Sequence, residues 1–237
     1  MSESLELITK KMLIDVVMKR FNIRLQPIMS LIDEQLCGFE VLSEPPSEVN
    51  MTEWFERCST DQLLQLRKWQ LMTLAKENLT VKLFINVTTA ILASEEGATA
   101  LLQDPLPGVI ELQDPVALAR LDAPRLALLA GNIQRLQDAG MEVWLDDYLC
   151  DYGDKLAASG LMFDGVKLDY AAFQQFRNDS ARLAMLIDGA RRFGRFVLAE
   201  GVESQSDART AWLAGADLAQ GFYWPEKKIQ ALPYSCL

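Results

Sequence analysis

The sequence predicts an α/β protein in which strands and helices alternate around a barrel that contains one antiparallel strand. Short apolar runs of strand length alternate with longer stretches of helical periodicity, which is typical of βα units around a parallel sheet. Six or seven such units in 237 residues fit a (β/α) barrel better than an open sheet, the alternative that composition leaves open. A predicted hairpin near the start turns one strand antiparallel to the others.

The first elements follow from two different periodicities. Residues 5–20 carry apolar side chains at helical spacing with lysines between them, which predicts a helix. Residues 21–28 alternate at period two and predict a strand, and residues 37–42 predict a second one. The Asp33-Glu34-Gln35 turn between these strands predicts a hairpin.

The later strands are short apolar runs bounded by turn residues. They are expected at 81–87, 108–112, 141–145, 165–169, 196–200 and 217–221. Helices are expected at 51–77, 88–102, 171–192 and 203–214, with one or two more in 115–139 and a short one beyond Lys227. Ser59 or Thr60 is a candidate N-cap that interrupts the first of these helices. The stretch before residue 165 is expected to be rich in loops, and residues 1–237 are expected to form one domain.

Composition excludes several classes of function. The net charge of −10 argues against binding nucleic acid through a broad electrostatic surface. The chain contains no histidine, which excludes Ser-His-Asp and Cys-His catalysis and leaves any metal to oxygen or cysteine ligands. Oxygen ligands suit Mg, Mn or Ca.

Neither a membrane span nor a secretory signal is expected. The apolar runs fall short of the 18 or more residues that a membrane span needs. The acidic start Met1–Glu6 is no secretory signal. Cys37, Cys58, Cys150 and Cys236 lie far apart and are interpreted as reduced thiols. A cytoplasmic protein without a membrane or nucleic-acid partner is therefore expected.

The strand at 141–145 runs directly into two adjacent carboxylates, Asp146 and Asp147. One such pair is by itself more often a solvated turn than a site. The pattern is repeated, however, because polar groups lie in or at the end of successive apolar runs. They are Glu40, Asn86, Glu111, Asp146, Asp147, Lys167, Asp169, Glu200 and Gln220. Since strand C-termini converge at one mouth of a βα barrel, a common site is the favoured interpretation.

This set of carboxylates, amides and one lysine is the inventory of an oxygen-ligated two-metal hydrolase. Paired cations clamp the attacking and leaving oxygens of a phosphoryl displacement and lower the pKa of water. Lys167 could hold or activate that water, and Glu200 could orient it or act as the base.

Eight segments in order resemble the EAL-domain phosphodiesterases, which linearise cyclic di-GMP, over roughly residues 8–233. The segments are Gln26-Pro27, Glu40-Val41-Leu42, Ile85-Asn86-Val87-Thr88, Glu111-Leu112-Gln113-Asp114, Asp146-Asp147, Val166-Lys167-Leu168-Asp169, Ala199-Glu200-Gly201-Val202-Glu203 and Gln220-Gly221-Phe222. Glu40-Val41-Leu42 occupies the place of the signature Glu-Ala-Leu. The resemblance implies a modified TIM barrel of the EAL type with one antiparallel strand.

The resemblance also implies roles for individual residues and partners. The first Mg or Mn would be bound by Glu40, Asn86, Glu111 and Asp146, and the second by Asp146 with Asp147. The attacking water would be surrounded by Lys167, Glu200 and Gln220. The cyclic di-GMP substrate would contact Gln26, Leu42, Asp169 and Glu203. A homodimer and a role in motility, fimbriae or biofilm would fit the family.

Three segments depart from the family pattern. Glu44 stands where family members usually carry a ligand-contacting arginine, Leu149-Cys150-Asp151 replaces a glycine-containing loop, and Pro225-Glu226-Lys227 replaces Ser-Arg-Pro. Three functions therefore stay open. The first is a working cyclic di-GMP phosphodiesterase, which is favoured because the two-metal set is complete. The second is a protein without turnover that binds a flagellar or fimbrial transcription regulator, and the third is a metal-stabilised scaffold.

Overall fold

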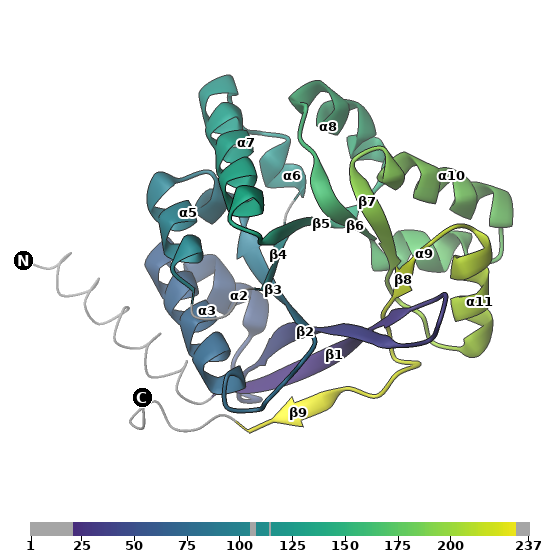
Figure 1. The fold of residues 1–237 in the computed structure, drawn as a ribbon, viewed down its shortest axis with the longest axis horizontal. Coiled ribbons are helices and arrows are strands. Elements are labelled where there is room, and N and C mark those ends of the chain that lie inside the picture. The colour runs from purple at the N-terminus through teal and green to yellow at the C-terminus, as the bar shows by residue number, and fades with distance from the viewer. Residues whose placement is uncertain (1–20, 105–107, 114, 231–237) are drawn as a thin grey trace, which may run out of the picture.

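The computed structural model describes residues 21–104, 108–113 and 115–230, which form a closed ring of eight strands with helices outside it (Figure 1). The ring consists of β1 (Asn22–Ser30), β2 (Leu36–Glu44), β3 (Lys82–Thr88), β4 (Val109–Gln113), β5 (Glu142–Tyr148), β6 (Phe163–Leu168), β7 (Gly194–Ala199) and β8 (Leu218–Ala219). Neighbouring strands from β2 to β8 pair in parallel, and β1 closes the ring by pairing antiparallel with both β2 and β8. The predicted mixed β/α barrel is confirmed.

A further strand, β9 (Lys227–Ile229), pairs antiparallel with the first half of β1, next to the place where β8 pairs with its second half. The short helix expected beyond Lys227 is therefore wrong for residues 227–229, and residues 231–237 lie outside the described part. Ile229 provides the reason, because its side chain is buried in the same apolar cluster as Ile23 and Leu25 of β1.

The helices pack against the outer face of the ring (Figure 1). They are α2 (Met51–Arg57), α3 (Thr60–Leu74), α4 (Thr89–Leu92), α5 (Glu95–Leu102), α6 (Pro115–Leu118), α7 (Ala123–Asp138), α8 (Gly153–Ser159), α9 (Tyr170–Phe176), α10 (Ser180–Arg191) and α11 (Gln205–Leu213), with one 3-10 turn, η1 (Cys150–Tyr152). None of the helices in the described ranges has the length and apolarity that crossing a bilayer requires.

Capping side chains explain where the predicted long helices divide. The predicted break at Ser59 is confirmed, since its hydroxyl accepts from Gln62 N at 3.3 Å and begins α3. The single helix expected at 88–102 is instead α4 and α5, because the Ser94 hydroxyl accepts from Gly97 N at 3.0 Å and begins a new helix. The helix expected at 171–192 is divided in the same way by Asp179, which caps α10.

Three further expectations concern the start of the chain, the stretch before residue 165 and the first two strands. The helix expected at 5–20 lies outside the described residues. The loop-rich stretch before residue 165 contains η1 and α8, so that expectation was only partly right. The predicted hairpin is confirmed: a turn at residues 31–33 joins β1 to β2, and Ser30 N donates to Gln35 O at 2.9 Å.

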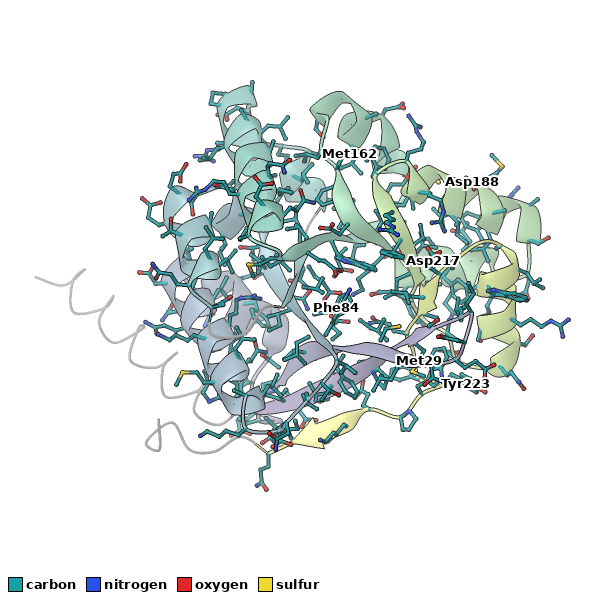
Figure 2. The ribbon with its side chains drawn as sticks, in the orientation of Figure 1. Met29, Phe84, Met162, Asp188, Asp217 and Tyr223 are labelled. Carbon is teal, nitrogen blue, oxygen red and sulfur yellow. The ribbon has the colours of Figure 1, made fainter. Side chains whose placement is uncertain are left out.

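Aromatic and aliphatic side chains fill the lower half of the barrel interior. This barrel plug consists of Ile28, Phe84, Val109, Trp144 and Leu198, all at most 2% exposed. Figure 2 shows Phe84 inside the ring of strands. Two glycines leave room for its rings, because a Cβ on Gly38 would lie 2.8 Å from Phe84 and one on Gly165 would lie 2.5 Å from Trp144. The plug forms a solid floor beneath the polar residues described next.

Candidate metal centre and active site

Eight polar side chains, one in or directly after each strand of the ring, face the interior above the barrel plug and toward the mouth where β2 to β8 end. The eight residues are Gln26, Glu40, Asn86, Glu111, Asp146, Lys167, Glu200 and Gln220. Each lies two positions along its chain from a plug residue or from Gly38, Gly165 or Leu218, and residues two apart in a strand face the same side. The sequence predicted all eight as site residues, and the structure brings them together.

Lys167 is the centre of this group and is only 1% exposed. Its Nζ lies 2.6 Å from Glu200 Oε1, 3.1 Å from Glu111 Oε1, 3.1 Å from Asp146 Oδ1 and 3.3 Å from Glu40 Oε2. The four carboxylates come from β2, β4, β5 and the residue after β7, so one ammonium group joins opposite sides of the barrel.

A second set of contacts links the amides to Glu40. Asn86 Nδ2 donates to Glu40 Oε1 at 3.0 Å, and Gln220 Nε2 donates to Glu40 Oε2 at 2.5 Å. The Gln220 amide also donates to Gln26 Oε1 at 3.0 Å, which connects β8 to β1. Both Glu40 oxygens are therefore held in a fixed orientation before any ligand binds.

The carboxyl groups differ in their tendency to ionise. Burial opposes ionisation of Glu40, but the Lys167 charge and the two amide donors hold its pKa below the usual value. Burial raises the pKa of Glu111 well above its usual range and also raises that of Asp146, despite Lys167. Burial likewise raises the pKa of Glu200 to about 8. Burial alone would lower the Lys167 pKa, but the surrounding carboxylates raise it well above its usual value, so its ammonium stays charged.

Asp147 lies at an irregular point of the barrel wall. The β5–β6 register shifts between Leu145 and Tyr148, and Asp147 has a left-handed φ of 55°. Desolvation and the neighbouring Asp146 charge raise its pKa to about 6. One carboxylate oxygen each of Asp146, Asp147 and Glu200 lie within 4.8 Å of one another, close enough to bind one cation.

Two observations test whether divalent cations fit this centre. Four carboxylates contact the Lys167 ammonium group, and the more exposed Asp147 lies beside Asp146 and Glu200. If all five are ionised, the centre carries an excess of four negative charges, which needs cations or protons. Asn86 Oδ1, Glu111 Oε2 and Gln220 Oε1 are buried and have no hydrogen-bond partner among the described residues. Unpartnered oxygens next to excess negative charge suit a hard divalent cation such as Mg, Mn or Ca.

The predicted substrate contacts do not all join the central group. Gln26 does so through Gln220, as described above. Leu42 lines a cavity of about 500 Å³ that also touches Asn86. Asp169 caps α9 by accepting from Ala172 N at 2.8 Å, and Glu203 accepts from the Tyr170 hydroxyl at 3.3 Å. These last two residues lie at the mouth, and their roles stay predictions.

The sequence analysis assigned no role to two aromatic residues at the mouth, although one of them, Phe222, belongs to the segment Gln220-Gly221-Phe222. Tyr170 and Phe222 are exposed and line a cavity of about 320 Å³ together with Gln26, Glu200 and Gln220. Tyr170 follows the predicted strand 165–169, and Phe222 follows the predicted strand 217–221. Because strand ends converge at the mouth of the barrel, these positions could have indicated that both residues lie there. Aromatic faces beside an acidic centre offer a stacking surface for a planar ring.

The fold and centre define a class: mixed β/α barrels whose mouth carries a buried, oxygen-rich centre suited to hard cations. Within that class the chain belongs to the EAL domain family, whose model matches residues 11–227. A search of curated proteins gives no match.

Solved structures of EAL proteins have the same fold. An EAL domain protein of Listeria monocytogenes EGD-e is 19% identical, with a TM-score of 0.74, and the match covers 95% of this chain and 97% of that one. BlrP1 of Klebsiella pneumoniae, in a manganese and cyclic di-GMP complex, is 21% identical with a TM-score of 0.70, over 89% of this chain and 56% of that one. A standalone EAL protein of Vibrio cholerae O395 in its c-di-GMP-bound form is 22% identical with a TM-score of 0.65, over 89% and 93%.

Proposed function

We propose that the protein is a metal-dependent phosphodiesterase that hydrolyses cyclic di-GMP to linear pGpG. The observation that carries the proposal is the convergence of four carboxylates on Lys167, with Asp147 beside Asp146 and Glu200 and with unpartnered oxygens next to them, at the mouth of an EAL barrel. The cyclic di-GMP complexes of BlrP1 and of the Vibrio cholerae protein support the choice of ligand. Such an enzyme would act on motility, fimbriae or biofilm through the level of this dinucleotide.

Two groups of side chains would hold Mg or Mn. One comprises Glu40, Asn86, Glu111 and Asp146, and the other Asp146 and Asp147, with Glu200 close enough to join it. When bound, paired divalent cations offset the charge of the phosphodiester and favour ionisation of the attacking water. The protein supplies the fixed orientation of these oxygens. Lys167 contacts four of the carboxylates, and the amides of Asn86 and Gln220 donate to Glu40.

The remaining groups would handle the water and its proton. Glu200, with its raised pKa, is suited to accept the proton of a water that attacks phosphorus. Lys167 stays protonated and would hold Glu200 in place, while the amides of Gln220 and Gln26 orient the water. The water oxygen forms the new bond to phosphorus, the bond to the 3′ oxygen breaks, and that oxygen takes up a proton to give pGpG.

Product formation tests the proposal directly. Purified protein is incubated with cyclic di-GMP and Mn or Mg, and pGpG is separated by chromatography. Glu111→Gln keeps the shape of a buried ligand and removes its charge, so turnover should fall by about 100-fold or more. The matched control is Glu95→Gln, an exposed partner of Arg135, which should behave like the wild type. Absence of pGpG from the wild type would reject the enzyme.

The second candidate is a protein that binds a flagellar or fimbrial transcription regulator without turnover. Two observations favour it: Glu44, which pairs with Lys228, supplies no cation at the Leu42 cavity, and the chain after Asp147 forms η1 and α8 without a glycine before Gly153. In that case a regulator recovered by pull-down would bind Glu111→Gln as well as the wild type. Loss of this binding in Glu111→Gln would argue against an independent binding function.

A further inference from the structure

The barrel wall opens between β2 and β3 on the mouth side of the metal centre. The ladder between these strands ends at Glu40 and Phe84, although β2 continues to Glu44 and β3 to Thr88. The cavity of about 500 Å³ that contains Leu42 lies at this opening and extends under α2 and α3. Because Asn86 lines it and also contacts Glu40, the cavity adjoins the metal centre.

Arg24 projects into this cavity from β1. It lies two residues from Gln26, on the same face of the strand, and opposite Leu42 in the β1–β2 ladder. The antiparallel register places Arg24 on the mouth side of Gln26, about 7 Å further along the strand. Its side chain is 34% exposed, and its Nε is buried without a hydrogen-bond partner among the described residues.

The guanidinium of Arg24 has one carboxylate partner in the described chain, Glu226. Its Nη1 donates to Glu226 Oε2 at 3.2 Å, and Glu226 is 17% exposed. Glu226 directly precedes β9, whose Lys228 lies opposite Arg24 in the β1–β9 ladder. Lys228 in turn bonds to Glu44, so the negative charge of Glu44 is already compensated.

Arg24 is thus the cation that the cavity offers to a ligand. Among the described residues that line the cavity, the other cationic side chain is Arg67. Arg67 is buried, and its Nε donates to Asp104 Oδ2 at 2.7 Å, which fixes its charge within the barrel wall. A dinucleotide with two phosphates would place one at the metal centre and needs a separate cation for the other.

We propose that Arg24 binds the second phosphate of the cyclic dinucleotide, the one away from the metal centre, and that Glu226 competes with this phosphate for the guanidinium. The inference rests on the proposed function. The unpartnered Nε and the Nη atoms can contact two phosphate oxygens at once. Binding then requires Glu226 to release Arg24, so Glu226 lowers the apparent affinity by the cost of that release.

The size of the two effects follows from the contacts. A partly exposed ion pair contributes little to stability, so release of Glu226 costs less than about fivefold in affinity. A charge-assisted contact to phosphate is stronger, and its loss in Arg24→Ala should raise the dissociation constant by about tenfold or more. Arg24→Lys keeps the charge without the bidentate donors and should lie between Arg24→Ala and the wild type.

Calorimetry of cyclic di-GMP binding in Ca tests the proposal, with the nucleotide checked by chromatography to be intact. We expect Glu226→Gln to bind about two- to fivefold more tightly than the wild type. The double variant Arg24→Ala/Glu226→Gln should bind like Arg24→Ala, because the competition needs Arg24. A gain from Glu226→Gln that persists without Arg24 would show general charge repulsion and overturn the proposal.

Arg191→Ala and Asp217→Asn are controls, since their ion pair of 2.9 Å is also partly exposed and lies at the opposite end of the barrel. Neither should change the affinity.

If Arg24→Ala and Glu226→Gln lower the melting temperature and leave the affinity unchanged, the pair only fastens β9, and the inference is wrong. If the wild type turns over cyclic di-GMP while the variants show no effect, the inference alone fails. If the wild type neither binds nor hydrolyses it, the proposed function fails too.

Discussion

Lys167 Nζ lies 2.6 Å from Glu200 Oε1, and this contact joins β6 to the residue that follows β7. The same ammonium group lies within 3.3 Å of carboxylates from β2, β4 and β5. A buried carboxylate group without any counter-charge would be strongly unfavourable. Lys167 therefore provides the positive charge that allows the acidic centre to form around it before metal binds.

Replacing Lys167 should affect stability and turnover together. Lys167→Met keeps the length of the side chain and leaves the carboxylates without their cation. In EDTA the free energy of unfolding should fall by about 3–5 kcal/mol, and Mn should restore part of it by supplying positive charge. Turnover of cyclic di-GMP should fall by about 100-fold or more.

Lys82→Met is the control for this substitution. Lys82 pairs with Glu142, and their side chains are 53% and 30% exposed, so loss of this partly exposed pair should cost less than about 1 kcal/mol. Chemical denaturation with and without Mn measures both variants. Equal losses for Lys82→Met and Lys167→Met would contradict a special role for the buried ammonium group.

The stability of the metal-free protein should fall as pH rises. A carboxyl group with a raised pKa binds its proton more tightly in the folded than in the unfolded chain, so the folded state loses this advantage as the group ionises. For Glu200 this window runs from its ordinary 4.5 to about 8, and for Asp147 from 3.8 to about 6. In EDTA the melting temperature should therefore decrease between pH 5 and pH 8.

Two comparisons isolate the cause. Glu200→Gln cannot ionise, so its melting temperature in EDTA should depend less on pH between 6 and 8. Saturating Mn should reduce or reverse the decrease, because cations bind the ionised carboxylates and stabilise the folded state. A melting temperature of the wild type in EDTA that increases over this range would contradict the prediction.

The site was more predictable than the details of the fold. Side chains along a strand alternate between its two faces, so the sequence predicts which residues face inward. A polar residue such as Asn86 inside an apolar run then marks the position of the centre. Side-chain caps such as Ser94 compete with helix continuation and are weak signals, so the divided helices were missed. The segment Lys227–Ile229 has no strong strand pattern, and only its pairing with β1 makes it a strand. Arg24 was missed because a charged residue in a half-exposed strand is common.

Backbone geometry at Asp147 leads to a further prediction. Asn tolerates the left-handed region better than most residues, so Asp147→Asn should keep the φ of 55° without strain. It removes a charge next to Asp146, and the metal-free protein should be at least as stable as the wild type. Mn affinity should fall by about tenfold or more, because one carboxylate of the acidic group is lost.

Thermal melts across a Mn titration measure this affinity. Asp147→Ala is the comparison, since it loses the carboxylate and also incurs about 1–2 kcal/mol of left-handed strain. The two variants should bind Mn equally weakly and differ in metal-free stability. Wild-type Mn affinity in Asp147→Asn would remove Asp147 from the metal centre.

The barrel plug should be as sensitive to added volume as the centre is to lost charge. In Gly165→Ala the new methyl group would lie 2.5 Å from the Trp144 ring, which is confined by Phe84 and Phe196. Overpacking of this kind costs about 1–3 kcal/mol. Because Trp144 lies two residues before Asp146 and Gly165 two before Lys167, the shift should also weaken Mn binding.

Gly131→Ala is the matched control: its Cβ meets nothing within 4 Å in α7, and the helix should gain about 0.5–1 kcal/mol. Denaturation and Mn titration of both variants check the prediction, and a Gly165→Ala protein as stable as Gly131→Ala would refute tight packing beneath the metal centre.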